Sequence, residues 1–590
     1  MTDHFADGRP RHGAIVVPGG LTRFAVWAPS VDAVSLEIKG ETPLPMAPSA
    51  GGWFLLEADA PAGTRYKFRL PDGLAVPDPA SRAQDGDVHG YSIVTDHSDY
   101  RWRHETWHNR PFHEAVIYEV HAGLLGGFSA MRKRLAAWAG LGITAIELMP
   151  IADFPGCRNW GYDGVLPYAP DASYGTPDEL KALIDEAHGH GLMMFLDVVY
   201  NHFGPDGAYI HSLAKPFFDE HVHTPWGAAI DFSRPEVVSF FLDNALMWLR
   251  DYRFDGLRFD AVHAISPQGA LPELAAGIRA GAAHPVHLVL EHEGNRASLL
   301  RAGPDAPGYD AQWADDFHHC VHVLLTGERD GYYAGFPEPA KQLARCLAEG
   351  FAYQGETPPG QDAPRGEASA HLPPQDFVFC LQNHDQIGNR AMGERLSVLT
   401  RPELLDAAAT LLLLSPFIPL LFMGEEWGAL SPFLYFTDHN ADLADAVREG
   451  RRREFAHFPA FRDEARRAAI PDPNAEASFA ASRLDEAACE REPHARAHAL
   501  YTRLLALRAA HVTPGIPGCK SLGSRALTDR AVFARWALGN GDNLSMAANF
   551  GDAPVAVDPV PGTLLFASVG APSGGLVPPC STCVWLEAQR

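Results

Sequence analysis

Three acidic side chains, each placed at the end of an apolar run, offer the most specific chemistry in this sequence. They are Asp260, Glu291 and Asp385. Hydrolysis of a glycosidic bond requires one carboxylate that attacks carbon and one carboxylic acid that protonates the leaving oxygen. Arg258 stands two residues before Asp260, so both can point to the same side of a strand, and a neighbouring guanidinium lowers the pKa of a carboxylate. We therefore predict Asp260 as the nucleophile, Glu291 as the acid and Asp385 as a transition-state stabiliser.

Imidazole and aromatic side chains accompany these carboxylates. His202 ends another apolar run and His384 directly precedes Asp385, and imidazoles can donate hydrogen bonds to sugar hydroxyls. Trp160 and Tyr162 lie in a loop where they either stack on a sugar ring or pack against each other. A single Asp after a strand is more often a helix N-cap than a nucleophile. The combination of residues, rather than any one of them, therefore indicates the chemistry.

The elements that position these residues follow one repeated pattern from about residue 114. Eight short apolar runs alternate with helix-like segments, which is typical of a (β/α)8 barrel, a TIM barrel of the α/β class. Active sites of such barrels lie at the carboxyl ends of the strands, where these polar residues stand. The expected strands lie within residues 115–121, 143–150, 192–201, 256–263, 287–293, 309–319, 376–385 and 419–426.

Two all-β regions flank the expected barrel. Residues 1–108 contain short alternating runs separated by Gly and Pro, which predicts an immunoglobulin-like β-sandwich, either a structural cap or a glycan-binding module. Residues 109–512 form the expected catalytic barrel, with polar insertions at 341–372 and about 437–494. Within the first insertion, residues 354–369 are expected to form a loop near the mouth of the site. Residues 513–590 predict a small all-β domain.

The composition of the chain indicates which kinds of binding partner and which cellular compartment to expect. The 590 residues carry a net charge of −25, a balance that disfavours nucleic acid and anionic membranes as partners and suits a neutral ligand. The N-terminal residues lack a signal peptide, and the longest apolar run, at 411–424, is too short to span a bilayer. Eight scattered cysteines do not form a disulfide framework. We therefore expect a cytoplasmic protein.

Four segments of the sequence resemble the signature regions of the α-amylase family, glycoside hydrolase family 13. They occur in the same order on the expected strands: residues 197–202 (DVVYNH), 255–263 (DGLRFDAVH), the Glu after 288–290 (LVL), and 383–386 (NHDQ). The resemblance implies a retaining mechanism with Asp260 as nucleophile, Glu291 as acid/base and Asp385 as transition-state stabiliser. It also implies carboxylates of Asp260 and Glu291 about 5 to 5.5 Å apart.

Further motifs resemble one branch of that family, the malto-oligosyltrehalose trehalohydrolases. They lie at residues 159–175, 311–319, 383–390 and 421–439, together with PDPASR at 77–82 and REGRRREF at 448–455. This resemblance implies cleavage of the α-1,4 bond next to a terminal trehalose unit. It also implies a substrate site: we expect Tyr162, His202, Arg258, His263 and His384 to contact substrate, and Asp316, His318, His319, Gln386, Asn389, Glu425 and Trp427 to contribute on the leaving side.

The segment that follows the expected acid departs from the family pattern. The family more commonly has an acidic and then a basic residue before Asn, whereas this chain reads Glu291-His292-Glu293-Gly294-Asn295. On a regular strand, Glu293 would share a face with Glu291. Both remain candidates for the acid, and we favour Glu291 because it directly follows the apolar run, as the acid of the family does.

Neither a cofactor nor a required metal is expected. No nucleotide-binding glycine loop follows a strand, and the residues near Asn201, where some relatives bind calcium, do not suggest a dedicated oxygen cage. Two rival functions within the family are glycogen branching and debranching. A non-catalytic glycan-binding protein on a degenerate barrel is a third, but it predicts the loss of at least one of the three carboxylates, and all three are present.

Overall fold

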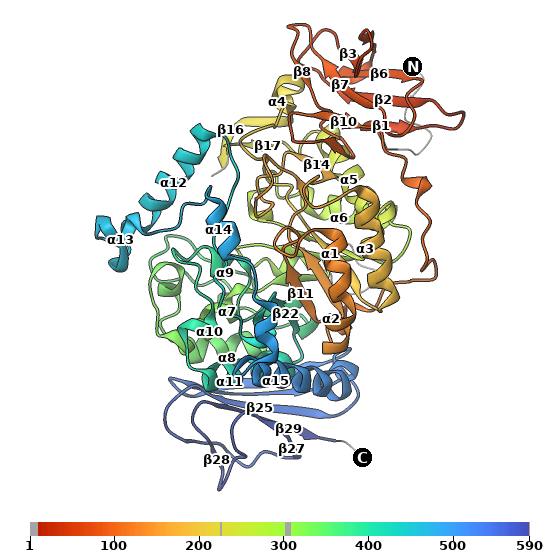
Figure 1. The fold of residues 1–590 in the computed structure, drawn as a ribbon. Helices are drawn as coiled ribbons and strands as arrows, with labels where there is room; N and C mark the ends of the chain where they lie inside the picture. Colours follow the sequence, from red (N-terminus) through yellow and green to blue (C-terminus); the bar gives the residue numbers. More distant parts are fainter. Residues whose placement is uncertain (1–9, 225–226, 301–307, 589–590) are drawn as a thin grey trace.

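The computed structural model describes residues 10–224, 227–300 and 308–588. Figure 1 shows three stacked parts: a β-sandwich near the N-terminus, a central barrel surrounded by helices, and a β-sheet domain at the C-terminal end. The predicted fold class, an α/β barrel with an N-terminal β-sandwich and a small C-terminal all-β domain, is confirmed.

Eight parallel strands close the central barrel. Seven lie within predicted runs, and the last begins at Ile418, one residue before the predicted run at 419–426. In barrel order they are β11 (Ile117–Val120), β12 (Ala145–Leu148), β15 (Met193–Val198), β18 (Gly256–Phe259), β19 (His287–Glu291), β20 (Ala311–Trp313), β21 (Phe377–Cys380) and β22 (Ile418–Phe422). Strand β22 pairs back with β11, so no strand edge of the barrel is left open.

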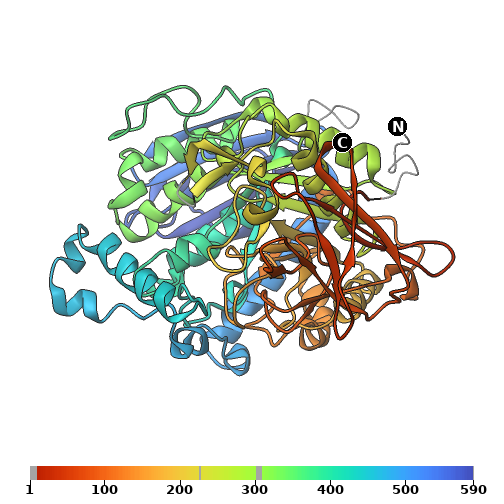
Figure 2. The same ribbon diagram turned by 90° about the horizontal axis from the view of Figure 1, so that it is seen from above.

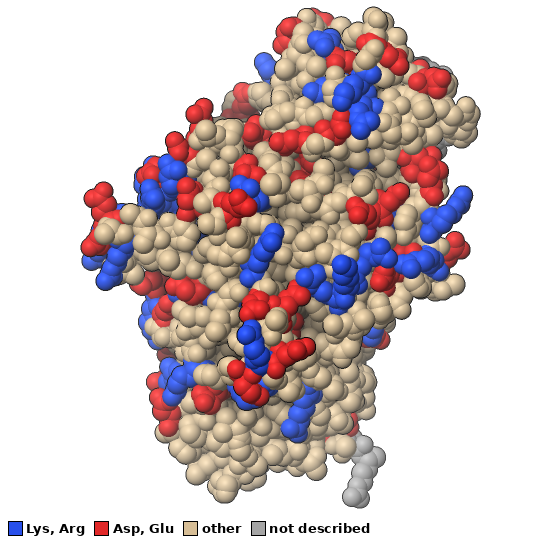
Figure 3. All heavy atoms as spheres, viewed as in Figure 1, with Lys and Arg blue, Asp and Glu red and all other residues tan. Residues whose placement is uncertain are grey.

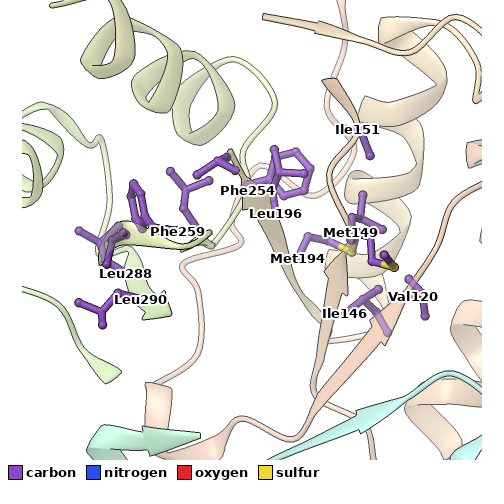
Figure 4. Close-up of a cluster of buried hydrophobic side chains, with 14 of the residues drawn as sticks. Val120, Ile146, Met149, Ile151, Met194, Leu196, Phe254, Phe259, Leu288 and Leu290 are labelled. Carbon is purple, nitrogen blue, oxygen red and sulfur yellow. The ribbon is translucent and has the colours of Figure 1, made fainter. Parts of the chain in front are cut away.

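Side chains of each barrel strand alternate between the interior and the surrounding helices. On β15, Met193 and Phe195 join a cluster with inward-pointing residues of other strands, whereas Met194 and Leu196 pack outward. Figure 4 shows the outward cluster, in which Met194 and Leu196 lie with Ile146, Phe259 and Leu288. Burial on both faces explains why these strands read as continuous apolar runs.

Helices cover the outside of the barrel. The longer ones are α3 (Pro177–Gly189), α5 (Pro235–Arg250), α6 (Ala270–Gly281), α7 (Asp315–Thr326), α8 (Pro339–Glu349), α11 (Pro402–Leu414), α12 (Ala441–Phe455) and α15 (His494–Leu507), and a shorter one is α2 (Leu135–Leu141). Helix α3 begins with a capping box, because Thr176 accepts from the Glu179 amide and the Glu179 carboxylate accepts in return. Figure 2 shows α12 and the following residues projecting to one side of the body.

The N-terminal sandwich consists of two antiparallel sheets. One contains β1 (Gly13–Val16), β2 (Thr22–Trp27), β6 (Trp53–Ala58) and β5 (Ala47–Ser49), and the other contains β4 (Leu44–Pro45), β3 (Ser35–Ile38), β7 (Arg65–Arg69), β8 (Ala75–Val76), β10 (Tyr91–Ile93) and β9 (Gln84–Asp85). The Trp27 and Trp53 rings are buried, and Trp27 lies against Phe217 of the barrel part. These contacts fit a structural cap better than a sugar-binding surface.

The C-terminal domain packs against the amino-terminal side of the barrel. Its main sheet has the order β23 (Lys520–Thr528), β24 (Ala531–Ala537), β25 (Asn543–Asn549), β29 (Ser581–Glu587) and β27 (Thr563–Ala567). The Trp536 indole donates to Leu347 O of α8, and the Thr582 hydroxyl donates to Ala407 O of α11. We propose domain boundaries at 108/109 and 512/513, since both positions fall between elements of neighbouring parts.

Candidate active site

A single buried guanidinium gathers three carboxylates at the carboxyl end of the barrel. Arg258 Nη1 donates to Asp197 Oδ2 at 2.6 Å and to Asp260 Oδ1 at 2.9 Å, and Nη2 donates to Glu291 Oε2 at 2.7 Å. The Arg258 side chain is 0% exposed, and its guanidinium lies 4.1 Å from the centre of the Trp313 ring. Charges buried this deeply require partners, so the four groups form one mutually dependent unit.

Asp260 is held from two further directions. Asn201 Nδ2 donates to both Asp260 Oδ2 and the Asp260 carbonyl, at 2.8 Å each. The next residue, Ala261, has a φ of 41°, a left-handed conformation that only a well-packed environment holds in a residue other than glycine. This sharp turn directs the Ala261 N–H to Glu291 Oε2 at 3.0 Å. The backbone after Asp260 therefore helps to fix the acid candidate beside the nucleophile candidate.

The two glutamates that compete for the role of acid lie in different surroundings. Glu291 ends β19 and shares the Arg258 guanidinium with Asp260. The Glu293 side chain is 72% exposed, and its ion-pair partner is His263 at 3.8 Å. Both residues border the same cavity. Proximity to Asp260 therefore favours Glu291, in agreement with its place directly after the apolar run.

Asp385 is positioned by the first turn of helix α9 (His384–Gly388). Asn383 caps this helix: its side-chain oxygen accepts from the Asp385 N–H at 2.9 Å, while Gln386 Oε1 accepts from the Asn383 N–H at 3.2 Å. Asn389 Nδ2 donates to Asp385 Oδ1 at 3.1 Å. The N-cap explains why the sequence Asn-His-Asp-Gln turns directly from strand to helix at this point.

The site opens to a cavity of about 300 Å³, and Asp260 is not among the described residues that line it. Glu291 and Asp385 line it, and so do four other predicted substrate-contacting residues, His263, His319, Gln386 and Asn389. Residues of the predicted mouth loop, among them Pro358, Gln361 and Arg365, form part of its wall. The cavity is large enough for sugar units and is lined mainly by groups that can exchange hydrogen bonds with hydroxyls.

Other predicted residues lie next to this wall rather than on it. The Tyr162 hydroxyl donates to Asp197 Oδ2 at 2.6 Å, and its ring stacks on His384 with centroids 5.1 Å apart. His202 Nε2 lies 2.9 Å from Tyr162 O, and its Nδ1 contacts Asn201 Oδ1. Burial lowers the pKa of His202. The structure thus brings Tyr162, His202 and His384 together around the Arg258 cluster.

Four predicted leaving-side residues are placed away from the cavity. Asp316 is fully buried and ties Arg365 to the backbone of Ala352 and Tyr353. His318 is also fully buried, between Leu381 O and the Tyr333 hydroxyl.

The other two, Glu425 and Trp427, follow β22 in a short 3₁₀ turn. Glycines with φ of 86° and 64°, at 424 and 428, bound this turn and direct it toward α15, where Tyr501 donates to Glu425 at 3.2 Å. The resemblance implies that these four residues contribute to the substrate site, but burial and local turns direct them into packing.

Four residues near the cavity were not singled out from the sequence. Asp197 bonds Arg258 and Tyr162, and burial raises its pKa to about 7 despite Arg258. Glu119 of β11 contacts His384, and Asp315 and Tyr332 line the cavity. A signal existed for Glu119: it is an acidic residue inside an apolar strand, which is unfavourable unless paired.

The described residues contain no group of three or more His, Cys, Asp or Glu side chains arranged to hold a metal ion. All eight cysteines are free. None of the helices in the described ranges is long and apolar enough to cross a membrane.

Two family models match parts of this chain. A family model described as "Alpha amylase, catalytic domain" matches residues 104–223, and a "Domain of unknown function (DUF3459)" matches residues 519–585. A branching enzyme of Mycobacterium bovis, which represents the rival function, is 35% identical over only 40% of this chain and 36% of its own.

Relatives that match most of this chain are trehalohydrolases rather than branching enzymes. The malto-oligosyltrehalose trehalohydrolase of Deinococcus radiodurans is 43% identical over 86% of this chain and 84% of its own, and that of Saccharolobus solfataricus is 42% identical over 74% and 78%. A crystal structure of a Salmonella typhimurium protein superimposes with a TM-score of 0.92 at 43% identity, covering 98% of this chain and 99% of that one. The chain therefore belongs to the malto-oligosyltrehalose trehalohydrolases of the α-amylase family.

Proposed function

We propose that this protein hydrolyses the α-1,4-glucosidic bond next to the terminal trehalose unit of malto-oligosyltrehalose, releasing trehalose and a maltodextrin. The observation that carries the proposal is the Arg258 cluster, in which one guanidinium binds both Asp260 and Glu291, and Glu291 lines an open, polar cavity. Glycoside hydrolysis with retention requires two such carboxylates side by side. The names of the relatives supply the identity of the bond.

In the first step, Asp260 attacks the anomeric carbon of the glucose whose C1 forms the scissile bond. Glu291 transfers its proton to the leaving oxygen, so trehalose departs with that proton and the maltodextrin stays bound to Asp260 as an ester. Hydrogen bonds from Arg258 and Asn201 hold the Asp260 carboxylate in place beside Glu291. Arg258 and the Ala261 N–H both bond Glu291 Oε2, which leaves Oε1 to carry the proton.

In the second step, Glu291 takes a proton from water, and that water attacks the same carbon and releases Asp260. The maltodextrin is then freed with the α-configuration at its new reducing end. Asp385, fixed at the start of α9, would bind the sugar hydroxyls as positive charge develops on the ring. His319, Gln386 and Asn389, which also line the cavity, would contact the trehalose unit.

Digestion of defined oligosaccharides tests this function. Purified protein is incubated separately with maltotriosyltrehalose, maltopentaose and amylose, and products are identified by chromatography. We expect trehalose and maltotriose from the first substrate and little product from the others. Cleavage or branching of maltopentaose or amylose, with maltotriosyltrehalose left intact, would overturn the proposal in favour of the branching or debranching alternative.

Replacing each of the two candidate glutamates in turn by Gln tests which of them is the acid. Glu291→Gln removes the proton donor and should lower kcat on maltotriosyltrehalose by about 10²- to 10⁴-fold. Glu293→Gln removes an exposed carboxylate two residues away and should lower kcat by less than about tenfold. A larger loss of kcat in Glu293→Gln than in Glu291→Gln would identify Glu293 as the acid. An Asp260→Asn protein with full activity would contradict the nucleophile assignment.

We further propose that the protein acts in the cytoplasm as part of trehalose biosynthesis. Its partners would be malto-oligosyltrehalose and maltodextrin. The chemistry of the products, trehalose and a maltodextrin, supports this proposal. Fractionation of the source cells, followed by assay of each fraction with maltotriosyltrehalose, tests it, and activity in the culture medium would contradict it.

A further inference from the structure

The interior of the barrel has a polar layer directly beneath the candidate active site. Glu119 of β11 and Glu147 of β12 lie opposite each other in the parallel register of these strands, and each is only 1% exposed. Within the described residues, neither carboxylate oxygen of Glu147 has a hydrogen-bond partner, and burial raises the pKa of this group well above its ordinary value. Glu147 thus lacks a hydrogen-bond partner among the described residues, whereas Glu119 has one in His384.

Glu119 contacts His384 through both of its oxygens. Oε1 lies 2.5 Å from His384 Nδ1, and Oε2 accepts from the His384 backbone N–H at 3.2 Å. These two contacts fix the position of the residue and the rotation of its ring. The opposite ring nitrogen, Nε2, lies 3.5 Å from Asp385 Oδ2. The imidazole is therefore placed between two carboxylates, one in the barrel interior and one at the cavity.

We propose that Glu119 is a positioning residue that holds His384 as an imidazolium, with Nδ1–H directed to Glu119 and Nε2–H directed to Asp385. A neutral imidazole carries one N–H and could satisfy only one of the two carboxylates. A doubly protonated ring satisfies both. The inference about rate rests on the proposed function, because Asp385 is assigned there to the transition state.

The other groups around His384 are consistent with a cation. The Tyr162 ring stacks on it, and the Trp160 and Trp313 rings lie 5.7 and 6.1 Å away. The face of an aromatic ring attracts positive charge.

Two effects oppose the charge on His384. Burial and Arg258 both lower its pKa, but Asp385 and Glu119 outweigh them and raise the pKa to about 10. His121, which follows β11, has a pKa lowered by burial to about 4, so this neighbour is neutral. Asp385 and Glu119 are therefore the groups on which the charge of His384 depends.

The matched pair Glu119→Gln and Glu147→Gln tests the proposal. Both variants replace a buried carboxyl group in the same layer by an amide of the same size, but only the first removes a carboxylate that contacts His384. Imidazole nitrogens labelled with ¹⁵N are observed at about pH 8.5, where ordinary histidines are neutral. We expect one imidazolium signal in the native protein and in Glu147→Gln, absent from Glu119→Gln and from His384→Gln.

This spectrum needs no substrate, so it separates the proposal from the assignment of function. No imidazolium signal in the native protein would overturn the proposal, even if Glu119→Gln fails to fold. Persistence of the signal in a folded Glu119→Gln protein would overturn it as well. With maltotriosyltrehalose, Glu119→Gln should lower kcat by about 10- to 100-fold with a smaller change in KM, while Glu147→Gln keeps the native value. Equal loss in both variants would indicate a merely structural role.

Discussion

In the active site, one cationic side chain, Arg258, pairs with three carboxylates. Arg258 bonds Asp197, Asp260 and Glu291 at once, and its side chain is completely buried. A guanidinium has several donors in a rigid planar arrangement, so it can bind several carboxylates at once. A lysine ammonium would supply the charge without this geometry. At the scale of single residues, therefore, one side chain determines both the charge and the spacing of the catalytic pair.

Replacing Arg258 tests this dependence. Arg258→Leu leaves three carboxylates without their cation, so we expect kcat to fall by at least about 10²-fold and the free energy of unfolding to fall by about 3 to 5 kcal/mol. Arg258→Lys keeps the charge but not the bidentate geometry, so it should recover stability more than activity. Steady-state kinetics and denaturant unfolding measure the two effects. A Lys variant with native kcat would contradict the geometric role.

Strand register alone determines the direction in which Asp260 and Glu291 point. Asp260 and Glu291 follow strands directly, and both reach the Arg258 cluster. On helix α7 the predicted residue Asp316 is buried, while Asp315 lines the cavity. Adjacent residues of a helix point about 100° apart. An error of one position at the start of a helix therefore selects a buried residue instead of the one that faces the cavity. The alternation of a strand cannot be extended into the helix that follows it.

At the scale of elements, all eight barrel strands were predictable because burial on both faces produces long apolar runs. The path of the chain after each strand was not predictable from the sequence. The turn after β22 is redirected by the left-handed glycines 424 and 428, and Glu425 is consequently buried against α15. Such a turn depends on backbone dihedral angles and tertiary packing, which a local sequence pattern does not determine.

Glu425→Gln tests the packing role of this turn. Burial raises the pKa of Glu425 to about 8 from its ordinary value of 4.5. Between these values the folded protein keeps a proton that the unfolded chain has released, so this group lowers stability as the pH rises. The variant should therefore raise Tm more at pH 8 than at pH 5, with KM unchanged. Exposed Glu490→Gln is the control, and an increased KM in Glu425→Gln would return this residue to the substrate site.

At the scale of the whole molecule, the flanking β-domains support the barrel from outside the active site. Trp536 is fully buried and donates from the C-terminal sheet to α8, and the segment after α8 is held by Asp316 next to the cavity. On the face shown in Figure 3, acidic and basic side chains are interspersed rather than separated into large patches of one sign. A neutral oligosaccharide needs no charged surface to guide it.

Trp536→Ala tests whether the C-terminal domain contributes to stability without contributing to substrate binding. Loss of a fully buried indole should lower the free energy of unfolding by about 3 to 5 kcal/mol, because a cavity remains in the interface. The KM for maltotriosyltrehalose should stay at its native value at a temperature where the variant is folded. Leu522→Ala, at a side chain that is 53% exposed on the same domain, should change stability by less than about 0.5 kcal/mol. Comparable destabilisation by both variants would contradict the interface role.

Real-time proton NMR of maltotriosyltrehalose during digestion tests the central claim most directly, because it identifies both the bond cleaved and the stereochemistry. We predict signals of trehalose together with α-maltotriose, with the β-anomer growing later through mutarotation. Release of glucose or maltose without trehalose would contradict the assignment of the bond. Immediate appearance of β-maltotriose would contradict the double displacement through Asp260 and Glu291.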